Sequence, residues 1–239
     1  MKMTGRMKDY YDNVILLTGI TGLFTALPAL HFYRSDVFRR EYGRLIKSPP
    51  GQTLKFWESL LLLLMGAGFA LYGNLFVGSI AVFFDATSYQ ESMELITNQK
   101  GLLMMIWWMG VVAPFAEEVI FRWLIYLRLR DSMKIGRAAV ISGLIFGVYH
   151  GNIVQAIYAT LLGIMFAYIL EMSGNLWSSV LLHIGANIWA LILSEYAEKM
   201  MKESQMPIIM GIFALLFLIM IHGTKYFRRR GKERGYRAV

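Results

Sequence analysis

Two adjacent glutamates and an arginine stand inside an otherwise apolar stretch of the chain. Glu117, Glu118 and Arg122 lie within the segment 101–127, which is long enough to cross a bilayer. A charged group at membrane depth costs at least about 2.5–3.5 kcal/mol on insertion scales, so it marks a functional site by default. Two carboxylates in a low-dielectric site cannot easily both ionise, which suits one of them to act as a base near neutral pH. The pattern indicates acid–base chemistry inside a membrane.

Helical spacing assigns different surroundings to the two glutamates. Consecutive residues on an α-helix point about 100° apart, so one carboxylate can face a cavity while the other faces a neighbouring helix. Glu118 and Arg122 are four residues apart and can form an ion pair that makes their burial tolerable. Glu117 is then the better candidate to face a substrate. The alternative is a structural ion-pair cluster without catalysis.

Two of the four histidines lie within or at the end of apolar segments, each joined by a second residue at helical spacing. Phe146 precedes His150 by four residues, so we expect its ring to pack beside the imidazole and fix it. His183 precedes Asn187 by the same spacing, so both polar side chains should point into one cavity. The remaining histidines lie near the ends of the first and last apolar segments, where a side chain reaches headgroups and water: His31 and His222.

The elements that must position these residues are membrane-spanning helices. Hydrophobic residues make up 56% of the 239 residues and charged residues only 17%, which is far from the composition of a soluble domain. We predict an all-α, polytopic membrane protein with about seven transmembrane helices. It forms a single membrane domain, 1–239, whose third to sixth spans make a catalytic core at 101–194, flanked by 1–100 and 195–239. The predicted spans are 13–33, 57–84, 101–127, 138–150, 153–171, 175–194 and 207–222.

The basic residues predict how the chain is oriented. With seven crossings the termini lie on opposite sides, and 17 of the 24 lysines and arginines fall in loops and a C-terminal tail on one side. The positive-inside rule makes that side cytoplasmic, most simply at the plasma membrane. Three basic residues before the first span argue against this orientation for that helix alone. The net charge of +8 therefore indicates contact with anionic lipid headgroups, not with nucleic acid.

The three motifs, taken in order, resemble those of a known family. Glu-Glu-x-x-x-Arg, Phe-x-x-x-His and His-x-x-x-Asn occur at 117–122, 146–150 and 183–187, on three apolar segments. This order is similar to that of the CAAX protease and bacteriocin-processing (CPBP, or Abi) family of intramembrane proteases, which includes the type II CAAX prenyl endopeptidases. The resemblance covers about 101–194. Trp123 departs from it, because many members carry a glycine there.

The resemblance implies an intramembrane endopeptidase that hydrolyses a peptide bond in a membrane-associated protein or peptide. Glu117 and His150 would activate a water molecule, while His183 and Asn187 would stabilise the oxyanion. The residue types fit independently, since peptide hydrolysis needs a base and donors aimed at the developing negative oxygen. The substrate does not follow from these residues: a prenylated CAAX tail and peptide or bacteriocin processing both remain open.

The sequence favours no cofactor, although a metal is possible. Glu117, His150 and His183 make a plausible zinc set with an open fourth position. Against this, the His-Glu-x-x-His spacing is missing, and the resemblance implies metal-free hydrolysis that depends on glutamate. The chain has no cysteine, which excludes disulfides and thiolate ligands.

Two rival functions use the same buried charges. A non-catalytic peptide-binding or bacteriocin-immunity protein would retain the fold, but such a protein would be expected to have lost at least one of the motif residues. A proton- or metal-coupled transporter would show repeated halves, and the chain has no internal repeat.

Overall fold

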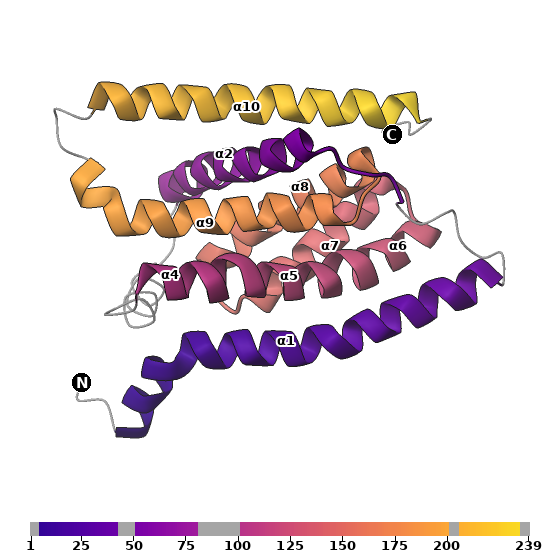
Figure 1. Cartoon of the computed structure of the whole chain (residues 1–239), viewed down its shortest axis with the longest axis horizontal. Helices are drawn as coiled ribbons and strands as arrows, with labels where there is room; N and C mark the ends of the chain where they lie inside the picture. The colour runs from indigo at the N-terminus through magenta and orange to yellow at the C-terminus, as the bar shows by residue number, and fades with distance from the viewer. Residues whose placement is uncertain (1–4, 43–50, 81–100, 201–205, 235–239) are drawn as a thin grey trace.

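A computed structural model describes residues 5–42, 51–80, 101–200 and 206–234 of the chain. Within these ranges the chain is helical and contains no strand, which confirms the all-α prediction (Figure 1). One nearly continuous helix covers 102–132 and includes two π-helical segments, η2 and η3. The elements are α1 (Gly5–Tyr42), α2 (Phe56–Ile80), α4 (Leu102–Met105), η2 (Ile106–Val112), α5 (Ala113–Glu118), η3 (Val119–Tyr126), α6 (Leu127–Ser132), α7 (Ile135–Tyr149), α8 (Ile153–Ser173), α9 (Trp177–Met200) and α10 (Met206–Glu233).

Among the described residues, six helices are long and apolar enough to cross a membrane, as expected of a polytopic membrane protein. The predicted fourth span is present as α7, but it has only 15 residues. At 1.5 Å per residue it extends about 22 Å, whereas the hydrocarbon core is about 30 Å thick. The long helices are Asn13–Arg39, Phe56–Ser79, Leu102–Ser132, Ile153–Ser173, Trp177–Tyr196 and Met206–Glu233.

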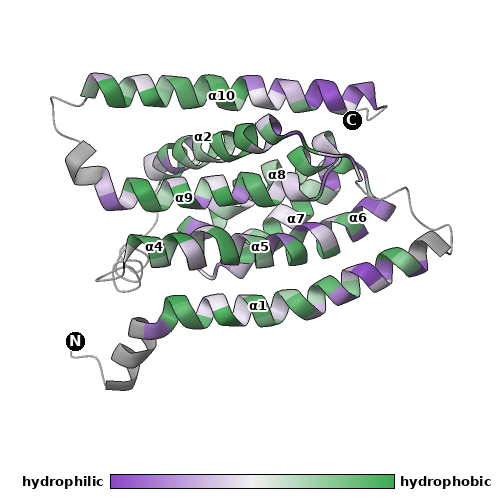
Figure 2. Cartoon of the chain, in the orientation of Figure 1, coloured by the Kyte–Doolittle hydropathy of each residue, from purple (hydrophilic) through white to green (hydrophobic). Residues whose placement is uncertain are grey.

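The long helices lie roughly parallel or antiparallel to one another, and α1 begins at the end of the bundle opposite to the one where α10 finishes (Figure 1). Figure 2 shows apolar residues along the middle of the helices and polar residues towards their ends. The end where α1, α6 and α10 finish carries many of the basic residues, on three segments that the sequence predicts to share one side of the membrane.

Three predicted loops begin later than expected, because the helices before them continue. Residues 34–42 extend α1, residues 195–200 extend α9, and residues 223–233 extend α10. No proline interrupts any of these extensions, so nothing in the backbone forces the helix to stop where the apolar residues end. The predicted break at Pro49 and Pro50 and the outer loop 85–100 lie outside the described residues.

Glycines let the backbones of α2 and α9 touch. A Cβ atom at Gly66 would overlap the carbonyl oxygen of Leu182, and one at Gly185 would overlap the backbone of Leu63. Small residues allow helices to approach closely, as they do at Gly66, whereas Gly78 on the same helix faces open space. This contact fixes the helix that carries His183.

The N-terminal ends of α2 and α9 are also joined through their backbones. Gln52 donates its N–H to the Gly174 carbonyl oxygen at 2.8 Å, and the Asn175 side chain donates to the Gln52 carbonyl oxygen at 2.5 Å. Gly174 adopts a left-handed conformation with φ of 69°, which glycine tolerates without strain. The α8–α9 turn is therefore tied to the segment that leads into α2.

A buried carboxylate holds α10 against α2. Glu58 is fully buried, and its oxygens accept hydrogen bonds from the Lys55 N–H at 2.7 Å and the Tyr226 hydroxyl at 2.5 Å. Arg230 forms an ion pair with the same side chain. Because the basic end of α10 has these partners, it stays helical beyond its apolar part.

Candidate active site

The buried ion pair predicted from the spacing of Glu118 and Arg122 is present. Glu118 ends α5 and Arg122 follows in η3, where the Arg122 Nε lies 3.3 Å from the Glu118 Oε2. Both side chains are completely buried, whereas the Glu117 side chain keeps 19% of its surface exposed. The structure thus confirms that Glu117 is the more accessible carboxylate of the two.

Two aromatic rings complete the surroundings of Arg122. Its guanidinium carbon lies 4.4 Å from the centroid of Phe146 and 5.3 Å from that of Phe166. Cation–π contacts of this kind stabilise a desolvated guanidinium. A Cβ atom at Gly163 would come within 2.8 Å of the Arg122 Nη2, so a larger residue there would displace the guanidinium. In the described part of the chain, the two terminal nitrogens of Arg122 have no hydrogen-bond partner.

His183 lies between the two carboxylates. Its Nδ1 is 3.1 Å from the Glu118 Oε1, and its Nε2 is 3.7 Å from the Glu117 Oε2. The imidazole is buried and stacks on the ring of Phe166, with the centroids 4.6 Å apart. One side chain from α9 therefore connects both glutamates of the preceding motif.

His150 stands at the C-terminal end of α7, with its ring held as the sequence predicts. The ring lies perpendicular to that of Phe146 with centroids 4.8 Å apart, and its Nδ1 is 2.8 Å from the Phe146 carbonyl oxygen. If Nδ1 donates to this carbonyl, the Nε2 of a neutral ring is an acceptor. Phe146 also packs 5.6 Å from the His183 ring, so the two imidazoles flank the same phenyl ring.

Asn187 lies one helical turn beyond His183 on α9. Its Nδ2 donates to the Met109 carbonyl oxygen at 2.9 Å, which joins α9 to the π-helical segment η2. A primary amide carries two N–H groups, so a second donor is present on the same nitrogen. Six of the motif residues therefore contact another motif residue, and Asn187 lies one helical turn from His183.

Two supporting residues carry no recognisable signal in the sequence. Phe166 of α8 contacts both Arg122 and His183, yet it is one apolar residue among many on an apolar helix. Ser142 donates to the Phe121 carbonyl oxygen at 2.9 Å and joins α7 to η3. Phe121 lies in a π-helical stretch, and such stretches are frequent at functional sites because they leave backbone groups for other partners. Only the three-dimensional arrangement could reveal these two roles.

No group of three or more histidine, aspartate or glutamate side chains within the described residues is arranged to hold a metal ion. The set that the sequence leaves possible for zinc, Glu117, His150 and His183, is not among such groups.

The fold and the site together define a class of protein: a polytopic helical membrane protein with a carboxylate–histidine cluster buried among its helices. Comparison with known proteins finds similarity to membrane peptidases. A family model described as type II CAAX prenyl endopeptidase Rce1-like matches residues 99–189, which include all three motifs.

A curated relative extends the match beyond the motifs. It is the “Putative membrane peptidase YdiL” of Bacillus subtilis (strain 168), 25% identical over 180 residues that make up 70% of this chain and 73% of the relative. No solved structure matches the chain. The motifs and both matches show that the chain is similar to CPBP family proteases.

Proposed function

We propose that this chain is an intramembrane endopeptidase that hydrolyses a peptide bond in a membrane-associated protein or peptide. The observation that carries the proposal is the gathering of Glu117, Glu118 and His183 from two separate helices at one buried point. Its substrate would be a CAAX-type tail or a peptide that is processed at the membrane. We place it in the cell membrane with its C-terminus in the cytoplasm, as the distribution of basic residues favours.

In this mechanism Glu117 is the base. Its carboxylate takes a proton from a water molecule that the Nε2 of His150 helps to orient, and the resulting hydroxide attacks the scissile carbonyl carbon. The tetrahedral intermediate then collapses, the bond from carbon to nitrogen breaks, and Glu117 returns the proton to the leaving amine. The exposure of Glu117 and the fixed ring of His150 support these roles.

His183 and Asn187 are the proposed oxyanion donors. The Nδ1 of His183 lies 3.1 Å from the Glu118 Oε1, so this role requires an N–H on Nδ1 facing Glu118 and a second N–H on Nε2 facing the oxyanion. The amide of Asn187 supplies a further donor.

The test is a Glu117→Gln variant, which keeps the size of the side chain and removes its basicity. We expect proteolysis to fall by a factor of about 100 or more, as for loss of a general base. Membranes from cells that carry either form would be compared by labelling new peptide N-termini. The control is Glu195→Gln, because Glu195 is an exposed carboxylate at the far end of α9. Identical N-termini in wild-type and Glu117→Gln membranes would instead favour a peptide-binding or immunity protein.

Hydrolysis in this proposal depends on glutamate and not on a metal. Cleavage by the purified protein should therefore persist in an excess of EDTA or 1,10-phenanthroline. The measurement is the initial rate with and without chelator, followed by addition of zinc. Loss of activity that zinc restores would contradict the metal-free mechanism while leaving the proteolytic function intact.

A further inference from the structure

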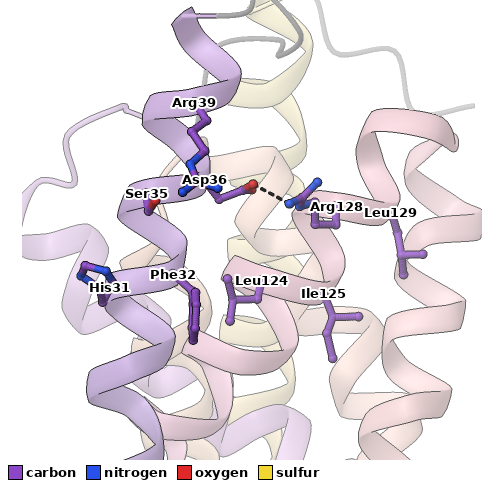
Figure 3. Close-up of a pocket in the computed structure, with 9 residues that line it drawn as sticks. All are labelled: His31, Phe32, Ser35, Asp36, Arg39, Leu124, Ile125, Arg128 and Leu129. Atoms are coloured by element: carbon purple, nitrogen blue, oxygen red, sulfur yellow. Dashed lines mark hydrogen bonds and ion pairs between the residues drawn. The ribbon is translucent and has the colours of Figure 1, made fainter.

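A cavity lies between α1 and the helix formed by η3 and α6, away from the carboxylate–histidine cluster (Figure 3). Its volume is about 630 Å³, which is the size of a small-molecule site. None of the motif residues lines it. The catalytic proposal therefore leaves this cavity unexplained.

The walls of the cavity are apolar along one part and polar along another. Phe32 of α1 and Leu124 of η3 face one another across the gap, with Ile125 beside them (Figure 3). Phe32 keeps 65% of its surface exposed, so its ring is accessible to a lipid chain. One to two turns further along each helix the lining becomes charged, with Arg39 on one side and Arg128 on the other. The cavity is amphipathic along its length.

The charged part lies at the depth of lipid headgroups. The apolar span of α1 ends at Arg39, and Arg128 lies in the last turn but one of the apolar span 102–132. Figure 2 shows polar residues on α6 and on the last turns of α1, the segments to which these arginines belong. The cavity thus opens where a phospholipid would place its phosphate, with its apolar walls where the acyl chain begins.

The charge of the lining favours an anion. Arg39 and Arg128 contribute two positive charges, and Asp36 contributes one negative charge. Asp36 pairs with Arg128 at 2.5 Å and links the two helices, but the Arg128 side chain is still 60% exposed and accessible to a ligand. His31 also lines the cavity, one position before Phe32 and so at the level of the apolar part.

We propose that this cavity binds one anionic phospholipid. Its phosphate lies between Arg39 and Arg128, and the upper part of an acyl chain lies between Phe32 and Leu124. Bound there, the lipid connects α1 to the same helix that carries Glu117, so it contributes to the packing of α1 against the core. The carboxylate of Asp36 competes with the phosphate for Arg128.

The test uses the purified full chain in mixed micelles, with phosphatidylglycerol titrated into phosphatidylcholine and bound lipid counted by native mass spectrometry. The double variant Arg39→Gln/Arg128→Gln should bind phosphatidylglycerol about 30-fold more weakly, the factor for loss of about 1 kcal/mol at each of two cationic side chains. The matched control, Arg34→Gln/Arg137→Gln, removes the same charge from exposed residues that do not line the cavity, and should bind like the wild type.

A second variant is expected to increase the affinity for the lipid, so it tests the proposal even if the double variant does not fold. Asp36→Asn removes the competing carboxylate and should bind phosphatidylglycerol about fivefold more tightly, again the factor for about 1 kcal/mol. Unchanged or weaker binding by Asp36→Asn, or equal weakening in the Arg34/Arg137 control, would overturn the proposal. So would displacement of the lipid by inorganic phosphate alone, because the site would then recognise a free anion without its acyl chain.

Discussion

At the scale of single residues, the site depends on how Arg122 and His183 contact two carboxylates among aromatic rings. Arg122 contacts Glu118 and the faces of Phe146 and Phe166, and His183 contacts both glutamates. The buried pair contributes little net stability, because the cost of desolvating both charges offsets most of their attraction. What it supplies is a fixed orientation for Glu118 and, through Glu118, for His183.

Removing one member of this pair should therefore be costly. Arg122→Met leaves Glu118 buried beside an apolar side chain, and we expect the free energy of unfolding to fall by about 3–5 kcal/mol. The double variant Glu118→Gln/Arg122→Met removes both charges and should recover a large part of that loss. Denaturant unfolding in detergent would be measured for the wild type, Glu118→Gln, Arg122→Met and the double variant. Additive losses would show that the two side chains are not energetically coupled.

The ion pair and the contact between Phe146 and His150 could both be predicted from the sequence, because each depends only on the geometry of a single helix. The bridging position of His183 could not, since it depends on which face α9 turns towards α5. The hydrogen bond from Asn187 to the Met109 carbonyl is another contact between helices that local spacing leaves undetermined.

At the scale of secondary-structure elements, the placement of His183 depends on the contact between α2 and α9. Gly66 and Gly185 bring the two backbones together close to His183. Small residues at such crossings allow van der Waals contact that larger side chains prevent. The position of α9 therefore depends on its contact with α2, a helix that carries none of the motif residues.

Gly185→Ala should push α9 away from α2 and move His183 relative to the glutamates. A displacement of about 1 Å at a catalytic group can reduce activity by about 100-fold, so we expect a loss of that order. The cleavage rate and the unfolding midpoint would both be measured. Gly78→Ala serves as the control, since it faces open space and should stabilise α2 by up to about 1 kcal/mol. Normal cleavage by Gly185→Ala would show that the contact does not position the site.

The sequence predicts the number, order and approximate centre of the helices well, because apolar length is a strong signal in a membrane protein. It predicts their ends less well. The ends of α1, α9 and α10 lie beyond the apolar residues, and α10 continues because of a buried glutamate that stands 172 residues earlier in the chain. Distant partners of this kind leave no local pattern.

At the scale of the whole molecule, the described helices form one bundle whose basic end brings together segments far apart in the sequence. Arg130 pairs with Glu171 at 2.8 Å, and Glu171 also accepts a hydrogen bond from Tyr126 at 2.7 Å. The helices α1, α6 and α10 all finish towards this end (Figure 1). This distribution supports the predicted orientation, with that end in the cytoplasm.

Because the chain has no cysteine, single cysteines can report the orientation directly. Ser132→Cys lies at the basic end after α6, and Gly101→Cys lies at the opposite end before α4; both positions are exposed. A membrane-impermeant maleimide added to intact cells should label Gly101→Cys, and should label Ser132→Cys only after the cells are opened. The reverse pattern would show that the C-terminus is outside.

The shortness of α7 has a consequence for the lipid around the molecule. A 15-residue helix falls about 8 Å short of the hydrocarbon thickness, so its last residues create a hydrophobic mismatch beside His150. A bilayer can adapt to a helix shorter than its hydrocarbon core by thinning locally. Thinning brings the headgroups and their bound water closer to the middle of the membrane. The polar turn at Gly151 and Asn152 would sit in that depression. Hydrolysis inside a membrane consumes water, and this depression would bring the aqueous phase close to the base.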